Sequence, residues 1–343
     1  MSEKPYSQSI QNLRTIAVIG VVLHHAVSGI YRGGNNQDLP GFLYLQLVNY
    51  GSILFMVISG YFFEKSIKKY PVKELVKKKF RNILLPYLLF VFPWFFFEYF
   101  ISPYYGKERG PEVTVGEAIN TVLFKTNYWF IINLIIIQLL NFFITKVSQV
   151  RWLVLLFTVI TLFYSANIYL RLFESAHSYA FLGFLSFFFC GRLIYRYSNV
   201  FQMVYEKVTG WKYYPFAFLP LLVLFYAVAI KESQWIHRHD PYTDFGNVLR
   251  LSNILFTGLL LLIFYRKRAK FNFGRAFTNK SVFLIYLTHP YFMRIGSFII
   301  NRFDISSWVF GMSGILMNIS FGIAILMFSL GASRLLLSCG FLK

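Results

Sequence analysis

Acidic side chains and cysteines are scarce in this sequence of 343 residues, and charged residues of either sign make up only 14% of it. A soluble chain of this length needs far more charge on its surface, so a soluble protein of one or two domains is excluded. The two cysteines, Cys190 and Cys339, are too few for a disulfide framework or a cysteine zinc site. The ten-residue alternation of a transmembrane β-barrel is also missing.

Hydrophobic residues are abundant instead and make up 57% of the sequence. Apolar runs of about 18 or more residues recur from end to end, and each can cross about 30 Å of hydrocarbon as a helix. We therefore expect an all-α, polytopic integral membrane protein with about ten transmembrane helices and a single membrane-embedded domain, residues 1–343. The expected spans are roughly 13–31, 43–63, 82–101, 128–145, 152–169, 179–195, 215–230, 248–265, 282–300 and 308–330.

The basic residues indicate the orientation in the membrane. Lys and Arg outnumber Asp and Glu by 34 to 14, but they collect in two loops, 64–82 with eight and 266–280 with six. In a soluble protein such an excess would suggest nucleic acid, whereas here we expect membrane lipids and no nucleic acid as partners. Ten spans place both loops and both termini on one side, and the positive-inside rule makes that side the cytoplasm. The expected location is the cell membrane, which in a double-membrane bacterium is the inner membrane.

The first span, "LRTIAVIGVVLHHAVSGIY", carries ionisable residues that a lipid-buried helix rarely has. Arg14 and His25 are eleven residues apart, so on a helix they lie about 20° apart around the axis and about 16 Å apart along it. They share one face, with Arg14 at the cytoplasmic surface and His25 past the middle of the membrane. His24 is rotated by roughly 100° from His25, so we expect it to point elsewhere and to matter less.

Each of these residues has a structural interpretation beside a chemical one. Arg14 could be an anchor that reaches the interface, or a guanidinium that holds phosphate or a polarised carbonyl. His25 could be a packing residue, a member of a proton relay, or a base that takes a proton from an attacking hydroxyl. The chemical interpretation places a donor from the cytoplasm opposite an acceptor from outside.

Two further features lie close to the basic loop 64–82. Ser59 and Gly60 interrupt an aromatic run near the cytoplasmic end of the second span, where small residues let a helix or a ligand approach closely. Ser59 lacks the G-x-S-x-G setting of a nucleophile. Arg81 precedes Pro86 at the start of the third span and could join Arg14 in a phosphate site.

Polar and aromatic residues recur in two later spans. Trp129 opens the fourth span, where an interfacial aromatic belt is the favoured interpretation, and Asn133 within that span could bind a neighbouring helix. In the ninth span, His289 directly precedes Pro290, which frees a backbone carbonyl and favours a kink. Tyr286 lies three residues before His289, so the two share a face that could line a polar cavity. His289 could instead be a structural residue.

No metal site is expected. His237 and His239, in "QWIHRHD", have a ligand-like spacing, but no third anchored ligand accompanies them, and an outer loop is the favoured interpretation. His177 is also expected in a loop. Walker, dinucleotide-binding and H-E-x-x-H motifs are missing.

Together the motifs resemble the acyltransferase-3 family of integral-membrane acyltransferases, which acylate sugars of cell-surface polysaccharides. Thr15 stands where the family usually has glycine, and "NYGSI" lacks the acidic residue often found before the second motif. The form "FMVISGYFF" is most similar to members that acetylate fucose or other envelope sugars. The matching stretches follow the family order from residue 13 to about 290: "LRTIAVIGVVLHHA", "LFMVISGYFF", "KKKFRNILLPY", "NYWFI" and "SVFLIYLTHP".

The resemblance implies a reaction and roles for the motif residues. The donor would be cytoplasmic acyl-CoA, most often acetyl-CoA, bound as a substrate and not as a tight cofactor, with Arg14 and Arg81 on its phosphates. His25 would be the catalytic base or a transient acyl carrier, and Arg14 would support it. The acceptor would be a hydroxyl of a glycan or lipid-linked sugar, and glycan-assembly proteins are possible partners. The remaining substrate-site candidates are Ser59, Gly60, Trp129, Tyr286 and His289.

Two alternatives stay open. The chain could transport glycans or lipids without acyl chemistry, although few intramembrane polar residues and no internal repeat support this. It could also pass acyl groups to a separate extracytoplasmic transferase, with the same chemistry at His25 and a different final acceptor.

Overall fold

The computed structural model describes residues 5–30, 39–101, 114–144, 147–174, 176–210, 214–239, 246–265, 277–303 and 314–341. Within these ranges the regular elements are all helical. The α-helices are α1 Pro5–Ile30, α2 Leu39–Val48, α3 Gly51–Ile67, α4 Val72–Lys79, α5 Leu85–Phe96, α6 Val115–Asn120, α7 Trp129–Asn141, α8 Val147–Leu170, α9 Leu185–Arg196, α10 Ser198–Thr209, α11 Tyr214–His239, α12 Leu251–Phe264, α13 Asn279–Arg302 and α15 Gly314–Ser338.

The described part of the chain does not confirm the number of membrane-spanning helices expected from the sequence. Within the described residues, six helices are long and apolar enough to cross a membrane, or seven if one bent pair counts as one span. That pair joins Val115–Lys125 to α7 at 87°, in place of the straight span expected over 128–145. The protein is therefore a multi-pass helical membrane protein, whereas the count of ten is not confirmed. Residues 1–4 and 342–343 lie outside the described ranges, and the side of the termini stays a prediction.

One basic stretch forms a helix where the sequence analysis expected a loop. The α4 helix begins after Pro71 and continues through a π-helical turn, Phe80–Leu84, into α5. Lysine is a good helix former, and Glu74 pairs with Lys78 one turn later at 2.8 Å. The other expected basic loop, 266–280, lies largely outside the described residues.

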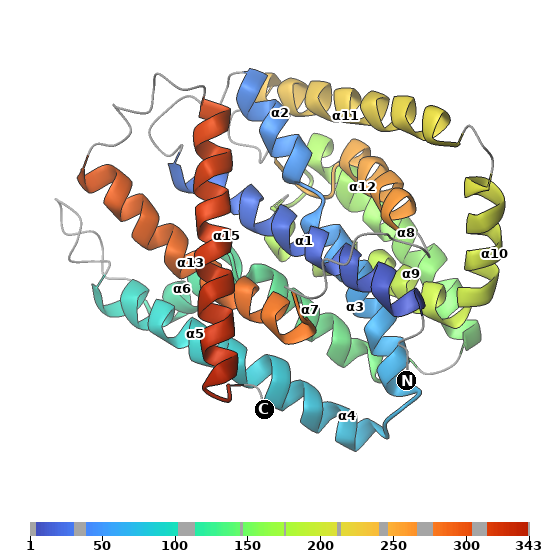
Figure 1. Ribbon diagram of the computed structural model, residues 1–343, viewed down its shortest axis with the longest axis horizontal. Coiled ribbons are helices and arrows are strands. Elements are labelled where there is room, and N and C mark those ends of the chain that lie inside the picture. The colour runs from blue at the N-terminus through green and yellow to red at the C-terminus, as the bar shows by residue number, and fades with distance from the viewer. Residues whose placement is uncertain are drawn as a thin grey trace.

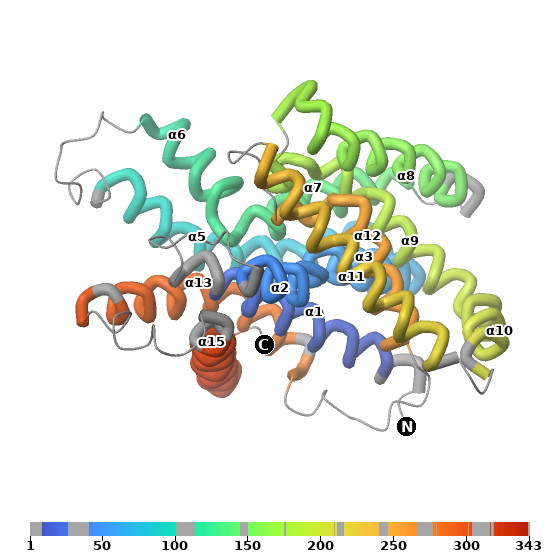
Figure 2. Tube along the Cα trace, turned by 90° about the horizontal axis from the view of Figure 1, so that it is seen from above, coloured from blue at the N-terminus to red at the C-terminus, as the bar shows by residue number. Residues whose placement is uncertain are grey.

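The α1 and α3 helices lie at the centre of the molecule (Figure 1). Seen from above, they run between α8 on one side and α15 on the other (Figure 2). This central position places the residues of the first span, Arg14 and His25 included, where several other helices can reach them. The expectation of one continuous helix through both residues is confirmed by α1.

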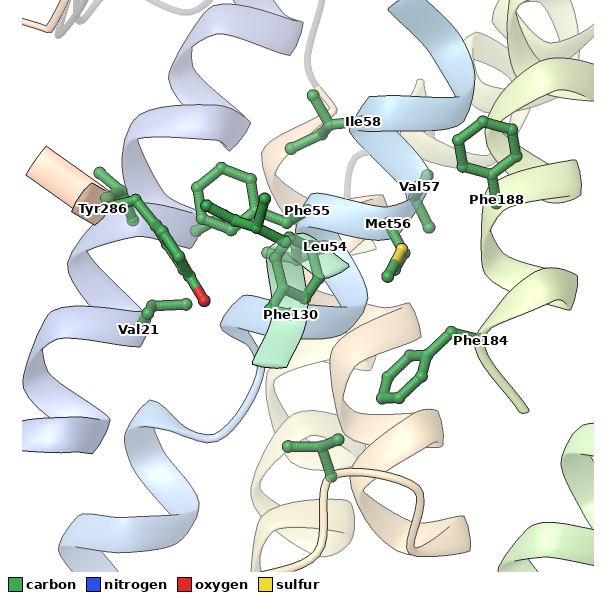
Figure 3. Close-up of a cluster of buried hydrophobic side chains, with 14 of the residues drawn as sticks. Val21, Leu54, Phe55, Met56, Val57, Ile58, Phe130, Phe184, Phe188 and Tyr286 are labelled. Atoms are coloured by element: carbon green, nitrogen blue, oxygen red, sulfur yellow. The ribbon is translucent and has the colours of Figure 1, made fainter. Parts of the chain in front are cut away.

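The α3 and α9 helices cross at two glycines. A methyl group added at Gly60 would lie 1.9 Å from the carbonyl oxygen of Phe188, and one added at Gly191 would lie 1.8 Å from that of Val57. Neither contact is possible, so the two backbones approach this closely only because both residues are glycine. Figure 3 shows Val57 of α3 beside Phe188 of α9 at this crossing. The interpretation of Gly60 as a packing notch is thus supported.

A buried ionic cluster joins the same two helices. Glu64 on α3 accepts hydrogen bonds from Arg192 at 2.8 Å and from Arg196, both on α9. Arg192 is fully buried and also donates to the side chain of Asn141 and to the carbonyl oxygen of Ile144, each at 2.8 Å. The guanidinium is therefore satisfied by three acceptors, which a buried charge requires.

Candidate functional site

A pocket of about 750 Å³ lies at the His25 end of α1. His24 and His25 form one part of its wall, and the junction between α6 and α7 and the turn at His177–Tyr179 form the rest. We call it the outer pocket. It is lined by His24, His25, Asn120, Phe124, Lys125, Thr126, Asn127, Trp129, Glu174, Ala176, His177, Ser178 and Tyr179.

His25 contacts His289 directly. The Nδ1 atom of His25 lies 2.9 Å from Nε2 of His289, and the two rings are nearly parallel. The sequence separates these residues by 264 positions, and the packing of α1 against α13 brings them together. His289 is completely buried, whereas His25 is half-buried. The structure thus pairs two histidines whose contact the sequence did not indicate, and His25 is the member that lines a pocket.

The ring of His289 is fixed by its own helix. Its Nδ1 atom lies 2.7 Å from the carbonyl oxygen of Tyr286 and 3.3 Å from that of Ile285. Pro290 continues the helix without an amide hydrogen, so the carbonyl of Tyr286, four residues earlier, loses its normal helical donor. The imidazole of His289 supplies the missing hydrogen bond.

A second pocket, of about 300 Å³, lies at the Arg14 end of α1. Three cations line it: Arg14 from α1, Lys79 from the end of α4, and Lys280 from the start of α13. The remainder of its wall is mostly apolar, with Ser59 and Tyr286 among the few polar groups. We call it the inner pocket. A cavity with three cations at an otherwise apolar wall suits an anionic ligand that carries a long apolar or amide-bearing arm.

Aromatic side chains lie between the two pockets. Tyr286 lines the inner pocket, and its hydroxyl donates at 2.7 Å to the carbonyl oxygen of Asn127, which lines the outer pocket. The rings of Phe55 and Phe130 lie 6.4 and 5.9 Å from that of Tyr286 (Figure 3). These three rings are named the aromatic partition below. Tyr286 also lies against His289, with ring centroids 5.4 Å apart.

Several predicted residues take positions that the sequence did not indicate. Trp129 is buried and packs against His177 at 4.8 Å, so it lines the outer pocket and does not sit in an exposed aromatic belt. The expectation that His24 points away from the site is wrong, because its ring lies 5.7 Å from that of His25 and lines the same pocket. Two neighbouring residues that are about 100° apart on a helix can both line a cavity of about 750 Å³.

Arg81 does not join Arg14. It lies exposed in the π-helical turn, and its Nε donates weakly at 3.4 Å to the neighbouring Asn82. Lys79 and Lys280 line the inner pocket in its place. The basic composition of 64–82 indicated cations near this site, but only the path of the chain through the turn after α4 shows which of them face inward.

The three remaining histidines are His177, His237 and His239. His237 and His239 are on the last turn of α11, where His239 stacks on Trp235 and His237 packs against Phe42. In the part of the chain that the structure describes, no three His, Cys, Asp or Glu residues group as metal ligands. His177, expected in a plain loop, lines the outer pocket.

Comparison with known protein families places this arrangement. A family model of the acyltransferase-3 type, described as an acyltransferase domain, matches residues 7–336.

The chain belongs to the acyltransferase-3 family.

The matched region includes all residues of both pockets and both histidines of the pair, so the resemblance seen in the motifs is confirmed across the fold. The protein is an acyltransferase embedded in a membrane by several helices. The same comparisons found no match among curated proteins and none among solved structures.

Proposed function

We propose that this acyltransferase moves an acyl group, most often acetyl, from cytoplasmic acyl-CoA to a sugar hydroxyl of a cell-surface or lipid-linked glycan. The observation that carries the proposal is the position of His25. It lines the outer pocket and contacts His289, which lies against the aromatic partition of the inner pocket. An acyl donor and an acceptor from opposite sides would meet at this imidazole.

The inner pocket is proposed as the donor site. Arg14, Lys79 and Lys280 would bind the phosphates of coenzyme A, because Lys and Arg form the strongest hydrogen bonds to phosphate oxygens. The flexible arm of the coenzyme would run along the apolar wall toward Tyr286. Since Arg14 and His25 are about 16 Å apart along α1, this arm carries the thioester from the phosphate site to the base.

The proposed chemistry needs one base. The Nε2 or Nδ1 atom of His25 takes the proton of the acceptor hydroxyl while its oxygen attacks the thioester carbonyl. The carbon–oxygen bond forms, the tetrahedral intermediate collapses with cleavage of the carbon–sulfur bond, and the imidazolium returns its proton to the coenzyme thiolate. A variant of this path, in which His25 carries the acyl group transiently, has the same reactants and products.

The outer pocket is proposed as the acceptor site. The aromatic rings of Trp129, Phe124 and Tyr179 offer flat surfaces for the apolar faces of a sugar, and Glu174 and Asn127 offer polar groups for its hydroxyls. Envelope sugars such as fucose fit this chemistry. The proposal includes a location in the inner membrane of a double-membrane bacterium, close to the proteins that assemble the glycan.

Mass spectrometry of released envelope glycans tests the proposal in cells that carry wild type, His25→Ala or a deletion. We expect added acetyl units in wild type and none with His25→Ala at matched expression, because the variant has no base at this position. His24→Ala serves as the neighbouring variant and should retain part of the activity, since the ring of His24 lines the pocket without the contact to His289.

The opposite results are equally informative. Acetylation that persists in His25→Ala would remove His25 from the chemistry. A glycan that is identical in wild type and deletion would favour transport without acyl chemistry. Acyl transfer to sugar by the purified chain alone would exclude the need for a separate extracytoplasmic transferase.

A further inference from the structure

We propose that His289 is a positioning residue that determines which ring nitrogen of His25 carries the proton. The inference rests on the proposed function only in taking His25 as the base. The first observation is the gap that Pro290 leaves in the hydrogen bonding of α13. Nδ1 of His289 faces two backbone carbonyl oxygens, of Tyr286 and Ile285. Carbonyl oxygens only accept, so this nitrogen must be an N–H donor.

The surroundings of the His289 ring also favour its neutral state. The ring is 0% exposed, and its described contacts are two carbonyl oxygens and the rings of His25 and Tyr286. A charged imidazolium would have no carboxylate among these contacts, and an uncompensated buried charge is strongly unfavourable. A neutral ring with its hydrogen on Nδ1 has a lone pair on Nε2.

The position of the hydrogen on His289 in turn determines the position of the hydrogen on His25. Nε2 of His289 accepts, so Nδ1 of His25, at 2.9 Å, must donate. The neutral ring of His25 then carries its hydrogen on Nδ1 and its basic lone pair on Nε2. A general base whose other nitrogen is held by a third group is the usual arrangement for an activated hydroxyl nucleophile, with a neutral imidazole here in place of a carboxylate.

The segment that carries His289 is anchored beside the outer pocket. The hydroxyl of Tyr286 donates to the carbonyl oxygen of Asn127 at 2.7 Å, and that of Tyr128 donates to the carbonyl oxygen of Leu287 at 2.8 Å. Both bonds tie the turn before His289 to the start of α7, beside Trp129. The acceptor nitrogen of His289 is therefore held in one place relative to the outer pocket.

Two substitutions test the contributions of the two nitrogens of the His289 ring separately. In His289→Gln the longer amide can still present an oxygen acceptor to Nδ1 of His25. In His289→Asn the shorter amide can donate to the Tyr286 carbonyl but is too short to reach His25. Both remain polar and buried, so a merely structural role predicts similar losses in the two variants.

We expect His289→Asn to lower kcat about 100-fold with KM for acetyl-CoA within about twofold, because residues that hold the other nitrogen of a histidine contribute about 10- to 100-fold at metal sites. His289→Gln should recover at least a tenth of the wild-type kcat. Equal activity of the two variants, or a loss confined to KM, would overturn the positioning role. Thermal unfolding in the same detergent checks that both variants fold.

A second measurement does not depend on activity. Nitrogen-15 magnetic resonance of the wild-type protein, with His25 assigned by the signal lost in His25→Gln, reports the protonated nitrogen directly. We expect hydrogen on Nδ1 in wild type and a shift toward the Nε2-H form in His289→Asn. An Nε2-H tautomer at His25 in wild type would overturn the inference. Nδ1-H at His25 in a chain without acyl transfer would leave the inference standing and remove the proposed function.

Discussion

At the scale of single residues, two neighbouring cations differ in their access to the inner pocket. Lys79 and Arg81 are only two positions apart, yet Lys79 lines the pocket and Arg81 is exposed. The π-helical turn that begins at Phe80 changes the direction of successive side chains at this point. The two residues therefore form a matched pair, alike in charge and neighbourhood but different in access to a bound anion.

This pair gives a test of the donor site. Lys79→Gln and Lys280→Gln should each raise KM for acetyl-CoA about tenfold, because a charge-assisted hydrogen bond to phosphate contributes about 1.5 kcal/mol or more. Arg14→Ala should impair donor use most, since Arg14 lines the inner pocket and also packs over the ring of Phe62, another residue of the pocket wall. Steady-state release of the coenzyme thiol measures these values.

Arg81→Gln is the control for those variants and should leave KM within about twofold. A larger effect at Arg81 than at Lys79 would place the phosphates on the outer side of the turn and restore the phosphate site expected from the sequence. Unchanged KM in all four variants would remove the inner pocket from donor binding.

At the scale of elements, the crossing of α3 and α9 holds the site together. Ser59 lines the inner pocket, and the next residue, Gly60, lies against the backbone of α9. The buried Glu64 cluster lies one turn further along α3 and pairs with α9 again. The position of Ser59 in the pocket wall thus depends on the close approach of two backbones, and the "SGY" motif combines a lining residue with a packing residue.

Alanine at either glycine should weaken this crossing. Gly60→Ala and Gly191→Ala should each lower the stability of the protein by about 1–3 kcal/mol, because the added methyl group meets a backbone carbonyl that cannot rotate away. The midpoint of thermal unfolding in detergent measures the effect.

Gly258→Ala in α12 provides the comparison. Apart from its chain neighbours and the nearby backbone of its own helix, no atom of the described residues lies within 4 Å of a methyl group at this position. Alanine should therefore stabilise the helix by about 0.5–1 kcal/mol. A midpoint for Gly60→Ala or Gly191→Ala as high as that of Gly258→Ala would show that the two helices can separate without cost.

At the scale of the whole molecule, the two pockets imply two sides of access. The basic α4 helix lies near the inner pocket, whereas Glu174 and His177 line the outer one. The positive-inside rule assigns α4 to the cytoplasm. Glu174 should then face the extracytoplasmic side.

Labelling of single cysteines tests this orientation. In a background with Cys190 and Cys339 replaced by serine, a membrane-impermeant maleimide should label Glu174→Cys in intact cells and Lys73→Cys only after permeabilisation. Both positions are exposed, so both can react. The reverse pattern would place the donor pocket outside the cytoplasm and contradict the use of acyl-CoA.

The sequence predicts part of this site because part of it lies within one helix. The spacing of Arg14 and His25 follows from helical periodicity alone, and the effect of Pro290 on a carbonyl is likewise local. His177, Lys280 and the pairing of Arg192 with Glu64 could not be found in this way. Their positions depend on contacts between segments far apart in the chain, and no pattern in a single sequence carries that information. The expected spans 128–145 and 179–195 overlap α7 and α9. The short lengths of these helices were not predicted for the same reason, since burial between neighbours lets a helix shorter than the bilayer remain in the membrane.

The aromatic partition has a consequence for the energetics of the cell. Phe55, Phe130 and Tyr286 all line the inner pocket, and an acyl group on its way to His25 would pass their packed rings. An acyl group is electrically neutral, and in the proposed reaction the proton taken from the acceptor returns to the coenzyme thiolate. The proposed reaction would therefore join the two faces of the membrane chemically without moving net charge across it.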